Sequence, residues 1–312
     1  MITDFSILRN RPCLKSIVDA QLLAWDSHID FLKLRFSDSA VNTIELSELL
    51  AKLVLILAEN KISQYAKDYR WMATNFLKED VYFRSNGKYR LSTFKQAYQE
   101  VYGKSGYMQR YIRGILISQV LWVNQVMAMD FYLTRFLPKT QRRGRFLEIG
   151  PGHGLFLYFA SERTECDTIQ GWDVSQSSIK ATQDALNLLN ARKPSKLVIR
   201  DIQEEPPFGE QFQSIVISEV LEHLERPQVA LKNLWKITAP GGIIFLNVPI
   251  NSPAPDHIFL WHAPEEVVQL VENQGFKIEE FFNAPATGFT EEEALRSKVT
   301  INVLLVARKP RS

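Results

Sequence analysis

The chain has 312 residues, a formal net charge of +2 at pH 7, 46% hydrophobic residues and 23% charged residues. These values are ordinary for a globular protein and exclude a low-complexity or intrinsically disordered chain. Two cysteines are too few for a disulfide scaffold, and they predict free thiols in a reducing compartment, the cytoplasm. We expect no secretory signal, because Asp4, Arg9 and Arg11 interrupt the first residues and no apolar core follows them.

The first part of the chain is expected to be mainly helical. Apolar residues recur at helical spacing through residues 17–34 and 44–58. The run 81–91 differs, because Asn86-Gly87 lies between alternating residues and favours a β-hairpin, in which both turn positions take positive φ. This small hairpin is expected either as the wing of a winged-helix-like module or as a plain hairpin between helices.

Residues 107–136 predict one long helix or two shorter ones. The stretch 114–129 within them carries no formal charge, but polar residues interrupt it and it is shorter than the about 20 apolar residues of a membrane span. We therefore expect a buried or half-buried helix and no membrane partner.

A Pro, a Gly and clustered positive charge at residues 137–145 predict a boundary between a helical domain, 1–138, and a second domain, 139–312. In the second domain strands alternate with helices. The expected strands lie near 145–149, 168–174, 197–200, 214–218, 242–248, 277–282 and 300–307. Repeated βα units predict an α/β fold, a doubly wound and mainly parallel seven-stranded sheet. No helical pattern separates the last two strands, which predicts an antiparallel hairpin at the sheet edge.

A glycine-rich turn follows the first predicted strand. The segment LEIGPGHG, residues 147–154, contains Gly150, Gly152 and Gly154 before a helix, a pattern that lets backbone approach a ligand closely. A dinucleotide fingerprint needs its third glycine where Leu155 stands. Glu148 beside the loop would repel phosphate and suit an ammonium group. An NAD(P)-dependent oxidoreductase remains an alternative.

Acidic residues follow the next three strands: Asp173 in GWDVS, Asp201 in VIRDI, and Glu219 in SEVLEH. With the glycine turn and the APGG turn at 239–242, this ordered set resembles the class I S-adenosylmethionine-dependent methyltransferases. The resemblance is to the small-molecule, natural-product type with an N-terminal helical cap, and it covers about residues 140–310.

The resemblance implies S-adenosylmethionine as cofactor and S-adenosylhomocysteine as product. The glycines would make room for the methionine part, and Glu148 would lie near its amino group. Asp173 would accept hydrogen bonds from the ribose, and Asp201 from the adenine amine. The cofactor-binding residues it implies are Glu148, Gly150, Gly152, Gly154, Asp173, Val174, Asp201, Ile202, Ser218 and Glu219.

Three histidines are candidate catalytic bases: His223, His257 and His262. Each has the alternative of a hydrogen-bonded structural role. Glu219, Glu222 and His223 stand at i, i+3 and i+4, so a helix would place them on one face, with His257 as a fourth ligand. This constellation resembles the metal site of the small-RNA 3′-terminal 2′-O-methyltransferases. We expect an active site without a metal ion. The alternative is a metal-assisted O-methyltransferase that acts on a diol or an RNA 3′ end.

We expect methyl transfer to an O, or an N, atom of a small molecule or short peptide in specialised metabolism. A net charge of +2 without a basic stripe argues against a nucleic-acid partner. Two alternatives remain for the residues Tyr107, Tyr111 and Arg113. They are expected in a helix–helix core, or in a lid that faces the cofactor carboxylate or the acceptor. The N-terminal helices are also candidates for a homodimer contact. A scaffold that binds the cofactor without catalysis is the non-enzymatic alternative.

Overall fold

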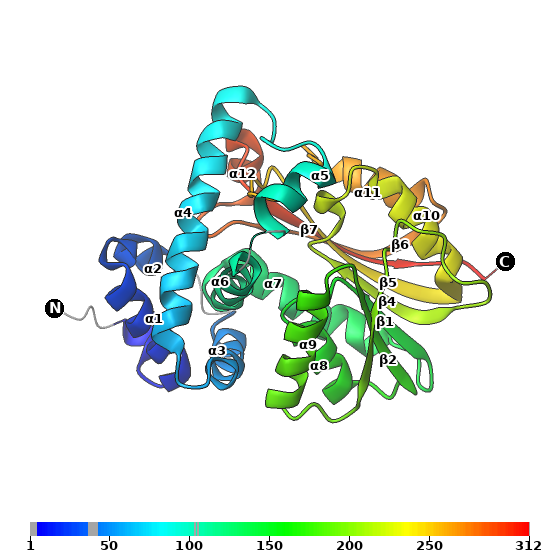
Figure 1. Cartoon of the computed structure of the whole chain (residues 1–312), viewed down its shortest axis with the longest axis horizontal. Coiled ribbons are helices and arrows are strands. Elements are labelled where there is room, and N and C mark those ends of the chain that lie inside the picture. Colours follow the sequence, from blue (N-terminus) through cyan, green and yellow to red (C-terminus); the bar gives the residue numbers. More distant parts are fainter. Residues whose placement is uncertain (1–4, 37–42, 103, 105, 312) are drawn as a thin grey trace.

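The computed structural model describes residues 5–36, 43–102, 104 and 106–311. Helices form the first part of the chain, and a twisted sheet with flanking helices forms the second (Figure 1). The N-terminus lies at the outer side of the helices and the C-terminus at the far side of the sheet. The boundary at residue 138 stays a prediction, although the last helical turn ends at Lys139 and the first strand starts at Arg145.

The helices of the first part are α1 (Pro12–Ala24), α2 (Ile29–Arg35), α3 (Ile44–Ala58), α4 (Ile62–Asn86), α5 (Phe94–Ala97), α6 (Tyr107–Leu121) and α7 (Val123–Phe131). Short turns join them: η1 (Ser6–Leu8), η2 (Asp26–His28), η4 (Tyr98–Tyr102), η5 (Tyr132–Phe136) and η6 (Leu137–Lys139). The predicted helix 17–34 is broken, because Trp25 leaves helical geometry with φ −155 and ψ 86. Trp122, with ψ 124, likewise separates α6 from α7, so residues 107–136 form two shorter helices instead of one long helix.

The hairpin predicted at 81–91 is wrong. Residues up to Asn86 continue α4, and Gly87 ends the helix in the left-handed conformation with φ 67. Its N–H donates to the carbonyl of Phe83 at 2.7 Å. A glycine with positive φ terminates a helix as readily as it turns a hairpin, so the Asn-Gly pair did not discriminate between the two. Neither a wing nor a plain hairpin is present at 81–91.

The sheet has seven strands in the order β3-β2-β1-β4-β5-β7-β6. They are β1 (Arg145–Ile149), β2 (Thr168–Asp173), β3 (Ser195–Ile199), β4 (Phe212–Ser218), β5 (Thr238–Ile250), β6 (Lys277–Pro285) and β7 (Ile301–Arg308). The first five run parallel, and β7 is antiparallel to both β5 and β6. The doubly wound fold with antiparallel edge strands is confirmed.

The helices of the second part are α8 (Leu155–Arg163), α9 (Gln176–Leu188), α10 (Pro227–Ile237), α11 (Pro264–Glu272) and α12 (Glu291–Ser297), with the turn η7 (Leu221–His223). The expectation that no helix separates the last two strands is wrong, because α12 lies there. This helix has seven residues and buries only Ala294, so no apolar period revealed it. Its capping box of Thr290 and Glu293 was the available signal.

The chain order reverses between β1 and β4, which are neighbours in the sheet. Ile149 pairs with Ile217, so the loops that leave these two strands start side by side. In open α/β sheets a ligand crevice lies at the carboxyl ends of the strands, where the order reverses.

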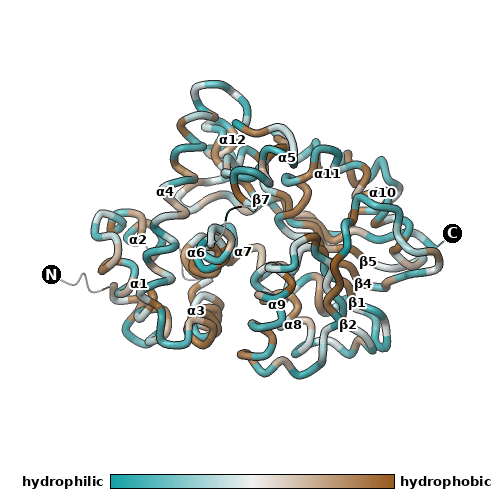
Figure 2. Tube along the Cα trace, in the orientation of Figure 1, coloured by the Kyte–Doolittle hydropathy of each residue, from teal (hydrophilic) through white to brown (hydrophobic). Residues whose placement is uncertain are grey.

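The two parts of the chain share one apolar core. The π-helical turn η5 inserts Tyr132 and Phe136 against the sheet, with ring centroids 5.5 Å and 5.7 Å from that of Phe245 on the fifth strand. Figure 2 shows hydrophobic colouring along the strands and polar colouring on much of the outer helices. The helical part is therefore packed on the sheet.

Within the described residues, no single helix reaches the length and apolarity of a membrane span. The helix pair 107–121 and 123–139 reaches them only when joined across an 80° bend.

Candidate active site

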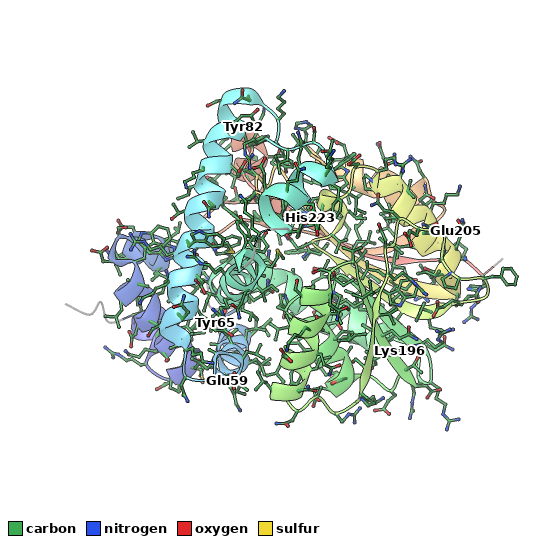
Figure 3. All side chains as sticks on the ribbon, in the orientation of Figure 1. Glu59, Tyr65, Tyr82, Lys196, Glu205 and His223 are labelled. Atoms are coloured by element: carbon green, nitrogen blue, oxygen red, sulfur yellow. The ribbon has the colours of Figure 1, made fainter. Side chains whose placement is uncertain are left out.

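A cavity of about 1130 Å³ lies between the carboxyl edge of the sheet and the N-terminal helices. Figure 3 labels His223, which lies on its wall, near the middle of the molecule, whereas Lys196 and Glu205 lie at the outside. Small-molecule sites usually measure about 300–1,000 Å³. The cavity is therefore large enough for two small molecules side by side.

The glycine turn forms one wall of this cavity. Gly150, Gly152 and Gly154 all have positive φ, at 67°, 47° and 79°. A Cβ on Gly150 would lie 2.6 Å from Cγ2 of Val220, so a side chain there would collide as well as strain the backbone. Gly150 and Gly152 line the cavity, whereas Gly154 caps α8 and lies behind the wall.

Glu148 lies below the glycine turn and is 1% exposed. One carboxylate oxygen, Oε2, has no hydrogen-bond partner among the described residues. Burial raises the pKa of this carboxyl well above its usual range, and the nearby charge of Asp173 adds to the effect. An unpartnered buried acceptor in a cavity wall is suited to a ligand that donates hydrogen bonds.

Asp173 ends β2 with its carboxylate fixed at the cavity wall. One oxygen accepts the backbone N–H of Ser175 and the other the hydroxyl of Ser178, both at 2.8 Å. Burial raises the pKa of Asp173, and these donors oppose the rise. Asp201 follows β3 and accepts the N–H of Gln203 at 2.8 Å. Val174, Ile202, Ser218 and Glu219 also line the cavity, so every predicted cofactor residue except Gly154 is on its wall.

Glu219 has φ 54 and holds a network of buried amides. Its Oε1 accepts from Asn302, which also donates to Asn247 at 2.7 Å and accepts from Asn124 at 2.7 Å. Burial raises the pKa of Glu219 to about 7, and the bond from Asn302 opposes this. None of these asparagines was predicted as a site residue. The available signal for Asn247 and Asn302 was a single amide inside each of the apolar runs IIFLNVPI and INVLLVA.

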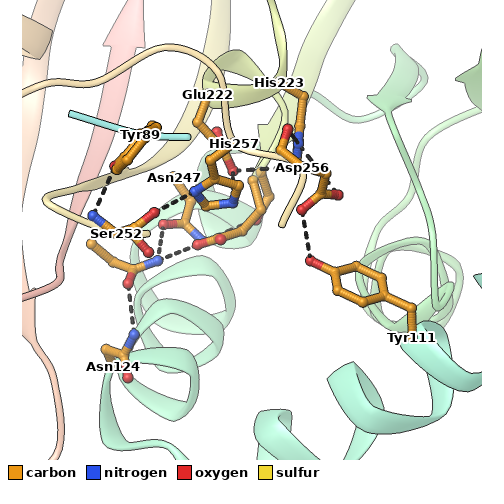
Figure 4. Close-up of polar contacts among 12 residues, drawn as sticks. Tyr89, Tyr111, Asn124, Glu222, His223, Asn247, Ser252, Asp256 and His257 are labelled. Carbon is orange, nitrogen blue, oxygen red and sulfur yellow. Dashed lines mark hydrogen bonds and ion pairs between the residues drawn. The ribbon is translucent and has the colours of Figure 1, made fainter. Parts of the chain in front are cut away.

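A second polar cluster lies around Asp256, also missed, which is 1% exposed. Its carboxylate accepts the hydroxyl of Tyr102 at 2.9 Å and that of Tyr111 at 3.3 Å, the latter shown in Figure 4. Two residues of the N-terminal part therefore reach across to the sheet loops. Its backbone carbonyl lies 3.1 Å from Nδ1 of His223. His257 completes the cluster, its ring 4.9 Å from that of His223.

The helix face predicted for Glu219, Glu222 and His223 is wrong. Glu219 lies before the turn η7, and its positive φ directs its carboxylate to Asn302. The remaining three ligand candidates, Glu222, His223 and His257, stay together, with ligand atoms within 4.8 Å of one another.

The structure separates the other predicted residues. Tyr111 lines the cavity, and Tyr107 packs behind it against the ring of Trp71 at 4.7 Å. Arg113 does not face the cavity, because the buried Asp68 on α4 binds its guanidinium at 3.4 Å. For Tyr107 and Arg113 the helix–helix core alternative therefore describes the structure. His262 is exposed and does not line the cavity.

Comparison with known proteins decides the family. The sequence model of a methyltransferase-domain family matches residues 125–280. The chain belongs to this methyltransferase family. It is an enzyme with S-adenosylmethionine as cofactor, which removes the oxidoreductase alternative.

The fold is also similar to that of solved structures. The pyocyanin biosynthetic protein PhzM aligns with a TM-score of 0.53 and 16% identity, over 79% of this chain and 72% of that chain. The N-methyltransferase NodS from Bradyrhizobium japonicum WM9 aligns with a TM-score of 0.46 and 20% identity, over 59% of this chain and 94% of that chain. No curated protein matches the sequence of this methyltransferase.

Proposed function

We propose that this methyltransferase transfers the methyl group of S-adenosylmethionine to an oxygen atom of a small aromatic or apolar molecule in specialised metabolism. The supporting observation is the division of one cavity into two unlike walls. Acidic residues at strand ends form the wall on the sheet side, and aromatic side chains from the helices form the other.

The sheet-side wall has the chemistry that the cofactor needs. The unpartnered oxygen of Glu148 would accept from the ammonium of the methionine part, above the space that Gly150 and Gly152 leave open. Asp173 would accept the ribose hydroxyls, and Asp201 with Ile202 would hold the adenine. Bound there, the cofactor supplies a methyl group already activated on a sulfonium.

The helical wall has the chemistry of an acceptor site for a flat molecule. Trp25, His28 and Phe31 stack in series, with ring centroids 4.4 Å and 4.6 Å apart. Burial lowers the pKa of His28 to about 4, so this imidazole is neutral at pH 7 and adds no charge to the wall. Phe76 and Trp122 extend the surface, their rings 5.9 Å apart. Aromatic walls of this kind suit a flat, apolar ligand that can stack on them.

The protein contributes alignment, exclusion of water and removal of a proton. The cavity wall would hold the two reactants next to each other, which lowers the entropic cost of in-line attack. A hydroxyl acceptor must also lose its proton. The proton would leave toward the carboxylate of Asp256, because this group borders the cavity and accepts from Tyr102 and Tyr111.

The test is transfer of a labelled methyl group from S-adenosylmethionine to a fractionated small-molecule extract of the protein's own host, with products followed by mass. We expect label in a low-mass aromatic compound bearing a hydroxyl group. Label in an amine or a short peptide would support methyl transfer but replace the proposed hydroxyl acceptor by another class of acceptor. Label only in RNA or in intact proteins would contradict the proposal.

A further inference from the structure

Three metal-ligating groups converge beside the acceptor half of the cavity (Figure 4). Oε1 of Glu222 lies 3.7 Å from Nε2 of His223 and 4.0 Å from Nε2 of His257. Around a tetrahedral ion with bonds of about 2.0–2.1 Å, neighbouring ligand atoms are about 3.4 Å apart. Small side-chain movements would therefore bring these atoms to coordinating distance.

The imidazoles of His223 and His257 each direct an unprotonated nitrogen, Nε2, toward Glu222. Nδ1 of His257 lies 2.6 Å from the carbonyl of Ser252, and Nδ1 of His223 lies 3.1 Å from the carbonyl of Asp256. A carbonyl oxygen only accepts, and the Tyr102 hydroxyl, 3.3 Å from Nδ1 of His223, donates to the Asp256 carboxylate at 2.9 Å instead. Each Nδ1 therefore carries the hydrogen, and each Nε2 of the neutral ring carries a lone pair. Metal-binding histidines are fixed in this way, by a hydrogen bond from the nitrogen that does not bind the metal.

Glu222 gives an independent indication of a cation. It is 0% exposed, and both of its carboxylate oxygens lack a hydrogen-bond partner among the described residues. A buried unpaired carboxylate is costly, and a protonated one would still need an acceptor closer than the 3.7 Å and 4.0 Å found here. The three groups facing one another have lone pairs and no suitable donor between them. A cation satisfies all three.

We propose that Glu222, His223 and His257 bind one divalent first-row transition-metal ion, with Zn²⁺ as the representative. Two imidazoles and one carboxylate form the donor set of zinc sites that keep an open position, and they suit ions that accept mixed nitrogen and oxygen ligands. His223 and His257 line the cavity while Glu222 lies behind them. The open positions of the ion would therefore face the cavity and take an oxygen atom of the acceptor.

The proposal extends the proposed function, and its test does not require methyl transfer. Zn²⁺ is titrated into the full-length protein after treatment with a chelator, without cofactor. We expect one ion per chain. Glu222→Gln should weaken the affinity by at least about 100-fold, more than the loss of an outer-shell partner of a metal site. His262→Ala, which removes an exposed histidine, should bind like the wild type.

Folding of the variant is checked independently. Glu222→Gln replaces a buried carboxylate by a neutral amide of the same shape, so the metal-free variant should melt no lower than the metal-free wild type. It should also keep the rise in melting temperature that S-adenosylhomocysteine produces. Failure of the wild type to bind one Zn²⁺ per chain, or equal affinity of Glu222→Gln and wild type, would overturn the metal site. Either result would leave the methyl-transfer proposal intact.

Discussion

At the residue scale, the site contains buried acidic residues that differ in the hydrogen-bond partners of their carboxylates. Asp173 is held by two donors of its own loop, and Glu219 by an amide from β7. Glu148 retains an oxygen without a partner. Burial raises the pKa of all three. Asp173 is therefore tested by ligand affinity and Glu219 by the pH dependence of stability.

Asp173→Asn tests the assignment of the ribose site. The amide keeps the shape but loses the charge and one acceptor, and a hydrogen bond to a charged group contributes about 1.5–3 kcal/mol. We expect the affinity for S-adenosylhomocysteine to fall by about 10-fold or more, measured by calorimetry. Asp184→Asn, at an exposed ion pair on α9, is the matched control. Unchanged affinity of Asp173→Asn would remove this residue from the cofactor site.

Glu219→Gln tests the buried carboxyl by the pH dependence of stability. Burial raises the pKa of Glu219 from 4.5 to about 7, so the native state binds this proton more tightly than the unfolded state. The free energy of unfolding should therefore fall as the pH rises from about 4.5 to 7, by up to about 3 kcal/mol from this group.

Denaturant titrations across this pH range measure the effect. Gln at position 219 has no carboxyl group to titrate. The free energy of unfolding of the variant should therefore decline less with rising pH than that of the wild type. An equal slope in wild type and variant would show that Glu219 does not titrate in this range. Glu265→Gln, an exposed position on α11, controls for the loss of one carboxylate.

At the element scale, apolar periodicity predicted the bounds of two elements correctly, whereas the Asn86-Gly87 turn signal and the lack of an apolar period at α12 were misleading. The helix at 44–58 and the strand at 145–149 agree with the predicted bounds, because burial of a continuous apolar face defines them. The helix end at Asn86 was taken for a hairpin, since positive φ at Gly87 is common to both structures. The short helix α12 has too few buried residues to produce a period.

Gly87→Ala tests the helix end that replaced the predicted hairpin. A Cβ at Gly87 would meet nothing within 4 Å, so the whole cost comes from φ 67. We expect a loss of about 1 kcal/mol in the free energy of unfolding. Gly87→Asn, which tolerates left-handed geometry better, should lose less. Equal stability of Gly87→Ala and wild type in thermal unfolding would contradict the left-handed cap.

At the scale of the whole molecule, the helices and the sheet are one packed body around a shared cavity. Residues on adjacent strand ends were predictable as site residues, because a strand and its following loop are local in sequence. Tyr102 and Asp256 lie 154 positions apart, and their contact follows from packing of the helices on the sheet. No local pattern in the sequence carries such a contact.

The shared core predicts cooperative unfolding of the entire chain. Tyr132 and Phe136 are fully buried against the sheet, so separating the two parts would expose a large apolar surface. We expect one calorimetric transition for the full chain and an aggregating or unfolded product when residues 139–312 are expressed alone. Two resolved transitions, or a folded monomeric fragment, would show that the parts are independent domains.

The cofactor site is tested most directly by an experimental structure of the protein with S-adenosylhomocysteine. We expect the ligand along the carboxyl edge of the sheet, with its amino group at Glu148 and its ribose at Asp173. Its sulfur should point toward Glu219 and leave the aromatic half of the cavity open for the acceptor. A ligand bound in the aromatic half, or outside the cavity, would contradict the division of this cavity between cofactor and acceptor.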